Sequence, residues 1–477
     1  MNNPAARIIR LRTAVLITTV LIGALATLGL PSLTAAQSPT RPFGTLRAQA
    51  DLQQRWLEQR LTTVLPALMR KHGVDMWVVP MREYNEDPTF SSLVSPTTFA
   101  ARRRTIYVFF DKCAAGNRAD SGDGSCVERI ALGGTSQGGL YEARRAAAAV
   151  DAGAEARQAE LVGDEQWNAL RQLIEERDPK VIQINVSRTF AFADGLTAGE
   201  RDGMSEALGA KWTARFRSID ALPVDFIATR VPDETAYYAK LQELVWQLTQ
   251  RMFSNDVITP GVTRTSDVVW WWRQQVNDLG LGTWFQPSVD VQRRGMSSAQ
   301  LGDDPIIQRG DLLHCDVGIV ALGLATDTQH DAYVLLLGET APPAGLQRAL
   351  RNGNRLQDLT LEELRPGRTG NQVLAATLAR MRSEGISGTL YSHPIGKNGH
   401  GAGAHVGRWD AQEGVPGTGD ALVTANMWYS IELQATTPVA EWGGQLVRMA
   451  QEEDAVIGPD GRVRWALRRQ ANLFLVR

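Results

Sequence analysis

The sequence predicts an α/β domain, followed by a second region in which strand-like segments carry isolated carboxylates. From Leu46 to about Val224, helix-like segments alternate with short apolar runs, which is the pattern of an α/β domain. The pattern changes at 222–233 (LPVDFIATRVPD), where Pro232 and the acidic residues after it indicate the start of a helix. We therefore expect an amino-terminal domain at 37–225 and a second domain at 226–477.

The amino-terminal domain is predicted to open with a helix and to continue with strands and helices. Residues 51–71 have helical periodicity, and 76–80 (MWVVP) and 105–110 (TIYVFF) are strand-like. A further helix is expected at 165–177 and a further strand at 180–185. We identify no cluster of catalytic residue types in this domain.

Residues 1–36 form a segment of a different kind. They combine an arginine-containing start, an apolar run without charge over 14–30, and a stretch of small residues that ends at Ala36. This is the three-part pattern of a secretory signal peptide, so we predict a periplasmic or secreted protein. An uncleaved membrane anchor is the alternative, because the run is close to the ~18 residues that make a spanning helix plausible. No later segment is apolar enough to span, so we expect no stable membrane insertion after signal removal.

The composition is that of a globular protein. Hydrophobic residues make up 43% of the 477 residues and charged residues 21%. With 50 basic and 52 acidic residues, the net charge is −2, which gives no electrostatic basis for nucleic-acid binding.

Three cysteines are present. Cys113 and Cys126 bracket a polar loop, and an exported chain meets oxidising conditions, so we predict a disulfide between them. Cys315 lies inside an apolar strand-like run and is predicted to be a buried free thiol.

The second domain is predicted to begin with two helices. One runs over about 234–252, and another starts near Thr265 and contains Trp270, Trp271 and Trp272. Three adjacent tryptophans on a helix cannot all face one core. At least one should face a partner, another domain or a groove.

Residues 309–338 (RGDLLHCDVGIVALGLATDTQHDAYVLLLG) are expected to form two strands, each with one aspartate in apolar surroundings. Ionised carboxylates such as Asp316 and Asp327 are costly to bury without compensation, and they also repel each other. A divalent cation would resolve both problems, since hard metals take oxygen ligands. The alternative is that both are turn or cap residues bonded to local backbone.

Further residues of ligand type follow. Five of the six histidines lie between 314 and 405, and Glu432, Glu452 and Glu453 stand in apolar runs. Two aspartates, one histidine and two glutamates would form an oxygen-rich site suited to a pair of divalent metals. The five clustered histidines are His314, His330, His393, His400 and His405.

The order of these residues resembles that of the pita-bread metallopeptidases. Asp316 in HCDVG is followed eleven positions later by Asp327 in LATDTQH, His393 opens HPIGKNGH, Glu432 stands in YSIEL and Glu453 in EEDAVI. The family includes methionine aminopeptidase, aminopeptidase P and prolidase, with creatinase as a metal-free relative. The resemblance covers about residues 230–477, and the region before it resembles the amino-terminal domain of the aminopeptidase P, prolidase and creatinase branch.

The resemblance implies a creatinase-like α/β domain followed by an α+β pita-bread catalytic domain. It implies an aminopeptidase or dipeptidase that cleaves Xaa-Pro bonds of a peptide substrate, with a hydroxide bridging two divalent ions, manganese first and cobalt or zinc as alternatives. Glu432 would move the proton of the attacking water, and His400 would bind substrate and the developing oxyanion. Members of the branch are often dimers or tetramers, so a homodimer fits. The implied metal ligands are Asp316, Asp327, His393, Glu432 and Glu453.

The sequence departs from the family pattern in several places. Glu432 is followed by Leu-Gln where Pro-Gly is common, Gln451 stands where the proline-specific branch usually has Arg, and 288–300 lacks the expected histidine. Glu452 and His400 therefore stay open as alternative ligands. Two alternative functions remain. The protein could bind a ligand in the pita-bread fold without turnover, or it could hydrolyse another C–N or ester bond. His330 and His405 are interpreted as hydrogen-bonded structural residues, and no role is assigned to His314.

Overall fold

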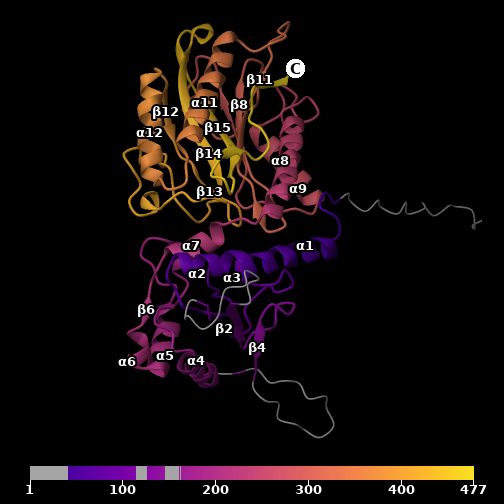
Figure 1. The fold of residues 1–477 in the computed structure, drawn as a ribbon. Helices are drawn as coiled ribbons and strands as arrows, with labels where there is room; N and C mark the ends of the chain where they lie inside the picture. Colours follow the sequence, from indigo (N-terminus) through magenta and orange to yellow (C-terminus); the bar gives the residue numbers. More distant parts are fainter. Residues whose placement is uncertain (1–40, 114–125, 146–160, 162) are drawn as a thin grey trace, which may run out of the picture. The chain divides into compact units, whose positions relative to one another are not determined.

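Two mixed β-sheets, built from separate stretches of the chain, organise the protein (Figure 1). This computed structural model describes residues 41–113, 126–145, 161 and 163–477. The signal peptide expected at residues 1–36 lies outside the described residues and stays a prediction.

Within the described residues, the first sheet has six strands in the order β4-β3-β2-β1-β5-β6. Strand β1 pairs antiparallel with β2 and parallel with β5, so the sheet is mixed, and the α/β class predicted for this part is confirmed. The strand expected at 180–185 is reduced to two residues. The strands are β1 (Met76–Arg82), β2 (Arg104–Asp111), β3 (Val127–Leu132), β4 (Glu142–Arg144), β5 (Ile182–Gln183) and β6 (Phe216–Arg217).

Helices cover this sheet on both sides. One apolar core lies under the first helical segment and contains Leu61 and Trp77, and a second core contains Leu170 and Ile182. The first helical segment consists of α1 (Leu46–Gln59), a π-helical turn (Arg60–Val64) and α2 (Leu65–Lys71). The other helices are α3 (Phe90–Leu93), α4 (Asp164–Arg177), α5 (Ala198–Leu208) and α6 (Ala210–Thr213).

Cys113 and Cys126 form a disulfide that joins the end of β2 to the start of β3, with Cα atoms 5.4 Å apart. Residues 114–125 of the intervening loop lie outside the described residues. Cys315 is a buried free cysteine.

The second sheet has nine strands, with the central order β12-β14-β15-β11-β8-β7. Strand β13 also pairs with β14, β16 with β15, and β17 with β11. The strands are β7 (Ser288–Gln292), β8 (Leu312–Val317), β11 (Thr328–Val334), β12 (Ser387–Leu390), β13 (His393–Ile395), β14 (Trp428–Val439), β15 (Gln445–Ile457), β16 (Val463–Trp465) and β17 (Phe474–Val476). A small hairpin of β9 (Val320–Ala321) and β10 (Leu324–Ala325) links β8 to β11.

One face of the second sheet packs against helices, which we call the helix face. Leu313 of β8 shares a core with the helices α8 (Pro232–Met252) and α9 (Thr265–Asp278). Ile431 of β14 shares another with α11 (Ala344–Glu363) and α12 (Gly370–Ser383). Figure 1 shows these two helix pairs near opposite edges of the sheet. Because side chains alternate along a strand, the neighbours of these apolar residues point to the other face, which we call the open face.

Adjacent tryptophans on α9 point in different directions, as the geometry of a helix requires. Trp272 is fully buried in the core, whereas Trp270 is 60% exposed. The guanidinium of Arg273 lies 4.9 Å from the Trp270 ring centroid, so this exposed ring has a cationic neighbour.

Helix α7 (Ala221–Ala228) joins the two sheets by packing on both sides. Leu222 and Phe226 belong to a core of the first sheet. Val224 and Ile227 belong to a core of the second. The boundary expected at residue 225 therefore falls inside a buried helix that both cores share.

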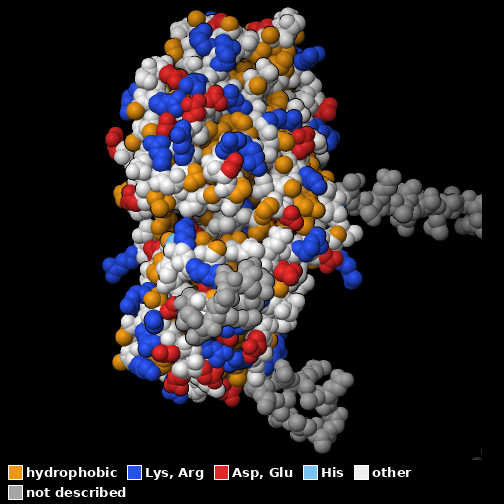
Figure 2. Space-filling model, in the orientation of Figure 1, with side chains coloured by type: hydrophobic (Ala, Val, Ile, Leu, Met, Phe, Trp, Pro, Cys, Tyr) orange, Lys and Arg blue, Asp and Glu red, His pale blue; other side chains and the backbone are white. Residues whose placement is uncertain are grey.

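The surface carries charges of both signs. Figure 2 shows Lys and Arg side chains interspersed with Asp and Glu over the face in view. Within the part of the chain that the structure describes, no helix combines the length and apolarity needed to cross a membrane.

Candidate metal centre

Four strands place a row of polar side chains across the open face. Asp316 of β8 is paired with Gln329 of β11, Gln329 with Glu452 of β15, and Glu452 with Glu432 of β14. Residues directly opposite each other on neighbouring strands point to the same face. The row therefore brings three carboxylates and one amide together in the middle of the sheet.

Asp327 and His393 reach the row from positions next to it. Asp327 precedes the first residue of β11, and His393 is the first residue of β13. The Nε2 atom of His393 lies 3.4 Å from Glu452 Oε1 and 3.6 Å from Asp327 Oδ2.

Two overlapping sets of possible ligand atoms contain Glu452, and a third set, from Asp327, His393 and His400, keeps His400 as an alternative ligand. The atoms offered by Asp316, Asp327 and Glu452 lie within 4.8 Å of one another. Those offered by His393, Glu432 and Glu452 do so as well. Glu452 belongs to both sets, which is the arrangement expected of a carboxylate shared between two cations.

These residues fit divalent ions. Asp316 Oδ1, Asp327 Oδ1 and His393 Nε2 are buried and have no hydrogen-bond partner among the described residues. Burial, followed by the charge of Glu452, raises the pKa of Asp316 to about 7 and that of Glu432 to about 10. The same two causes raise the pKa of Asp327 well above its usual value. Buried, mutually repelling carboxylates with free oxygens are the donor set that a hard cation stabilises.

Glu453, the ligand that the family resemblance implies, does not lie in this cluster, whereas Glu452, the alternative ligand, does. Glu453 is paired with Ile431 of β14, so its side chain lies on the helix face. There its Oε1 atom is 2.9 Å from Nε2 of His330 and accepts a hydrogen bond from the backbone N–H of Gln470. The correction follows from the register of β14 and β15, which pairs Glu432 with Glu452.

His400 and His405 lie in different environments. His400 is exposed, and its ring centroid is 4.7 Å from that of His393. Although the side chain is exposed overall, neighbouring groups shield part of the ring from water, and this desolvation, followed by the charge of His393, lowers the pKa of His400. Its imidazole is therefore neutral at neutral pH. His405 is half-buried, and burial lowers its pKa to about 4.

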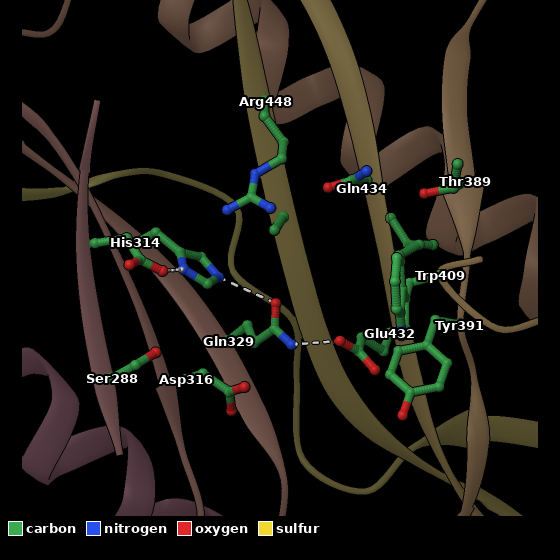
Figure 3. A pocket seen from close by; sticks show the side chains of 13 residues that line it. Ser288, His314, Asp316, Gln329, Thr389, Tyr391, Trp409, Glu432, Gln434 and Arg448 are labelled. Carbon is green, nitrogen blue, oxygen red and sulfur yellow. Dashed lines mark hydrogen bonds and ion pairs between the residues drawn. The ribbon is translucent and has the colours of Figure 1, made fainter. Parts of the chain in front are cut away.

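Gln329 links the cluster to His314, and neither residue was assigned a role from the sequence. The Nε2 amide of Gln329 donates to Glu432 Oε1 at 2.7 Å and to Glu452 Oε2 at 2.9 Å. Its Oε1 atom is 3.0 Å from Nε2 of His314, and His314 Nδ1 lies 3.5 Å from Asp290 Oδ2 (Figure 3). Burial lowers the pKa of His314, but Asp290 and the charge of Asp331 raise it to above its usual value. A protonated His314 donates to Gln329, which fixes the amide nitrogen toward the carboxylates.

A pocket of about 400 Å³ opens onto this row. Figure 3 shows Asp316, Gln329 and Glu432 in a row, with Tyr391 and Trp409 beside Glu432. Its size falls in the range of small-ligand sites. Residues two positions apart on a strand point to the same face of the sheet. This rule could have predicted that Gln329 lies on the same face as Asp327, and His314 on the same face as Asp316.

Metal binding should depend on pH in a defined direction. In the metal-free protein, Asp316 and Glu432 hold protons to about pH 7 and about pH 10, above their usual pKa values of 3.8 and 4.5. The folded state then binds more protons than the unfolded chain, so its stability falls as pH rises through these windows. A divalent ion should remove this penalty. We therefore expect the rise in Tm on adding Mn²⁺ to chelator-treated protein to grow from about pH 5 to about pH 8.

Differential scanning fluorimetry across this pH range would measure the effect. The exposed pair Glu362–Arg380 offers a control, because Glu362→Gln should leave the pH dependence of the metal-induced shift unchanged. A metal-induced shift of the same size at every pH would contradict the prediction.

Comparison with known families decides the class of the second domain. Residues 237–458 match the model of metallopeptidase family M24. This part of the chain is an M24 metallopeptidase domain. The match confirms the pita-bread fold predicted for it and supports a metal-dependent peptidase. A search of curated proteins found no match.

Solved structures resemble most of the chain, with matches that cover 86–89% of it and extend into the domain before the M24 domain. An X-Pro aminopeptidase from Thermotoga maritima is 14% identical, with a TM-score of 0.56 over 86% of this chain and 100% of that one. An Xaa-Pro dipeptidase from Bacillus anthracis is 14% identical, with a TM-score of 0.52 over 89% and 99%. The amino-terminal domain of the FACT subunit SPT16 from chickpea is 10% identical, with a TM-score of 0.54 over 89% and 99%. At these identities the likeness establishes the fold alone.

Proposed function

We propose that this protein is a peptidase that holds two divalent metal ions and releases an amino-terminal residue at an Xaa-Pro bond. The observation that carries the proposal is the pair of ligand sets that share Glu452. A single cation would leave one set of buried carboxylates uncompensated, because the two sets together contain four carboxylates and one histidine. The proposed ligands are Asp316, Asp327, His393, Glu432 and Glu452.

Divalent ions bound here would supply Lewis acidity and lower the pKa of a coordinated water. Manganese is our first choice, with cobalt or zinc as alternatives, because a carboxylate-rich site accepts several divalent ions.

The residues around the ions would act on protons and on substrate orientation. Glu432 stands at the edge of the pocket and is only partly buried. Bound cations would offset the charge of Glu452, which helps to raise the pKa of Glu432. The ionised carboxylate could then accept a proton from an attacking water and pass it to the leaving amine. The neutral imidazole of His400 carries one N–H that can donate to a developing oxyanion. One such donor is typically worth about 3 kcal/mol.

Two observations support the proposed preference for Xaa-Pro bonds. The solved structures that share the fold include proteins named X-Pro aminopeptidase and Xaa-Pro dipeptidase. The pocket beside the carboxylates is bordered by the rings of Tyr391 and Trp409, which offer apolar surface to a proline ring. An exported location remains a proposal from the sequence pattern of residues 1–36.

A second candidate is a protein that binds a ligand in this fold without turnover. The amide of Gln329 already supplies two donors to Glu432 and Glu452, and it stabilises these carboxylates in the absence of a cation. Such an arrangement favours a metal-free protein. The free oxygens of Asp316 and Asp327 favour the peptidase, because no donor among the described residues reaches them.

Cleavage assays on the mature chain (37–477) test the proposal. The chain is stripped by chelator, its metal content is measured, and Mn²⁺ is returned. We expect release of the amino-terminal residue from an Xaa-Pro peptide only after metal is restored, and slower release from a matched Xaa-Ala peptide. Tight metal uptake without cleavage would indicate another C–N or ester bond. Cleavage by metal-free protein, or neither uptake nor cleavage, would contradict the proposal, and the latter would favour the binding protein.

A further inference from the structure

A second, smaller cavity lies apart from the metal centre. It has a volume of about 50 Å³ and lies between α1, α3 and two segments of the second domain. Its lining shares no residue with the pocket beside the metal ligands. Its polar lining includes Trp56, Arg60, Ser92, Glu234 and Lys397.

Positive charge dominates the surroundings of this cavity. Arg60 and Glu234 are both almost fully buried, and Arg60 Nη2 donates to both carboxylate oxygens of Glu234 at 3.2 Å. Arg230 is also buried, and its Nη1 atom lies 3.9 Å from the same carboxylate. Lys397 is the third cation, and the charges acting on it are those of Glu234, Arg60 and Arg230.

The four groups carry a net charge of +2 at neutral pH, which the backbone carbonyls of Phe226 and Thr229, accepting from Arg60 Nη1 at 2.7 Å, offset only in part. Burial raises the pKa of Glu234, but the charges of Arg60 and Arg230 lower it to below its usual value, so the carboxylate is ionised. Burial, with the repulsion of the two arginines, lowers the pKa of Lys397 to about 8, and the ammonium therefore still predominates. Three cations thus face one carboxylate.

Two hydrogen-bond donors of the cavity wall are unpaired. The Nε1 atom of Trp56 and the Oγ atom of Ser92 are buried and have no partner among the described residues. Trp56 is 3% exposed and Ser92 2%, so bulk water does not solvate either group. Buried donors are rarely left without an acceptor.

We propose that this cavity binds a small anion, either a halide or a compact oxyanion. An anion would accept hydrogen bonds from Trp56 and Ser92 and would offset the charge of Arg60 and Lys397. Water could satisfy the two donors but would leave the net positive charge of the cluster unchanged. A cavity needs about 10–15 Å³ to hold one water molecule. The volume of this cavity therefore accommodates a small anion and excludes a nucleotide or a peptide.

The position of Lys397 connects this site to the metal centre. Lys397 lies in the loop between His393 and His400, and the carbonyl of its neighbour Gly396 accepts a hydrogen bond from the backbone N–H of Ala325 at 2.7 Å. The bound anion would hold the ammonium of Lys397, and with it the segment that connects His393 of β13 to His400. The inference does not depend on the proposed peptidase activity.

Thermal shift and diffraction measurements on the metal-loaded mature chain test the proposal. The protein is kept at constant ionic strength in sodium gluconate, and gluconate is replaced stepwise by bromide, chloride or sulfate. We expect a saturable rise in Tm of about 3 °C at saturation. Crystals soaked in bromide should give an anomalous peak in the cavity. A response to halides alone would identify a halide site, and a response to sulfate alone an oxyanion site.

Two variants and a control locate the effect. Lys397→Met keeps a side chain of similar length and should abolish the anion-dependent rise in Tm. Ser92→Ala should weaken anion binding about tenfold, since it removes one donor. Lys180→Met, at an exposed lysine away from the cavity, should respond as the unaltered protein does. No Tm response to any of the three anions, a bromide peak only elsewhere, or an unchanged response of Lys397→Met would overturn the proposal. None of these readouts needs a substrate, so they are independent of a failed cleavage assay.

Discussion

Replacing Glu452 by glutamine is expected to remove bound metal and to lower turnover by about 10³-fold or more. Glu452 belongs to both ligand sets, so its loss weakens both proposed metal positions together. Metal ions contribute several kcal/mol to transition-state stabilisation, and each 1.36 kcal/mol corresponds to about a tenfold change in rate. Metal content by elemental analysis and turnover on an Xaa-Pro peptide would measure the two effects.

The adjacent residue supplies a matched control. Glu453 has the same 1% exposure as Glu452, but it lies on the helix face against His330. Glu453→Gln should keep the metal and lower the stability by about 1–3 kcal/mol, because a buried partner of His330 is weakened. Loss of metal from Glu453→Gln, with retention in Glu452→Gln, would mean that the pairing of β14 and β15 differs from the structure described above.

Replacing Glu234 by glutamine is expected to destabilise the folded protein by about 3–5 kcal/mol. Glu234 is the carboxylate that faces the buried Arg60 and Arg230. Removing one partner of a buried ion pair leaves an uncompensated charge, which costs this amount in comparable cases. Urea unfolding of the metal-loaded protein, followed by tryptophan fluorescence, would measure the change in the unfolding midpoint.

Glu243 on the same helix provides the comparison for this effect. Its pair with Arg468 is exposed, at 40% and 49% of the two side chains, so Glu243→Gln should cost less than about 1 kcal/mol. Equal effects of the two substitutions would show that the buried cluster does not stabilise the fold as inferred here.

Much of the site could be predicted from residue type and local pattern. Asp316 and Asp327 stand out because apolar residues surround them, and the His393 motif places a histidine at the family spacing. The choice between Glu452 and Glu453 could not be made in the same way. Both lie in one apolar run, and only the pairing of Glu432 with Glu452 decides which side chain points to the open face.

The contacts between distant parts of the chain could not be predicted from the sequence. Arg60 and Glu234 are 174 positions apart, and each one, taken alone, is an ordinary residue of a helical segment. Helix α7 marked a change of composition, but its sequence does not reveal that Phe226 faces one core and Ile227 another. Whether one helix contributes to two cores depends on how the two sheets pack together. Neither helical periodicity nor helix propensity contains that information.

Glu452 and Glu453 are adjacent on β15 and point to opposite faces of the sheet, so both of their roles depend on the exact number of residues in the strand. Deleting or inserting one residue before them would turn every following side chain to the opposite face of the sheet. The glutamate that contacts His330 would then enter the candidate metal centre, and the glutamate shared by the two ligand sets would be forced among the helices. Substitutions can therefore alter one face of β15 without the other, whereas a single-residue deletion would change catalysis and folding together.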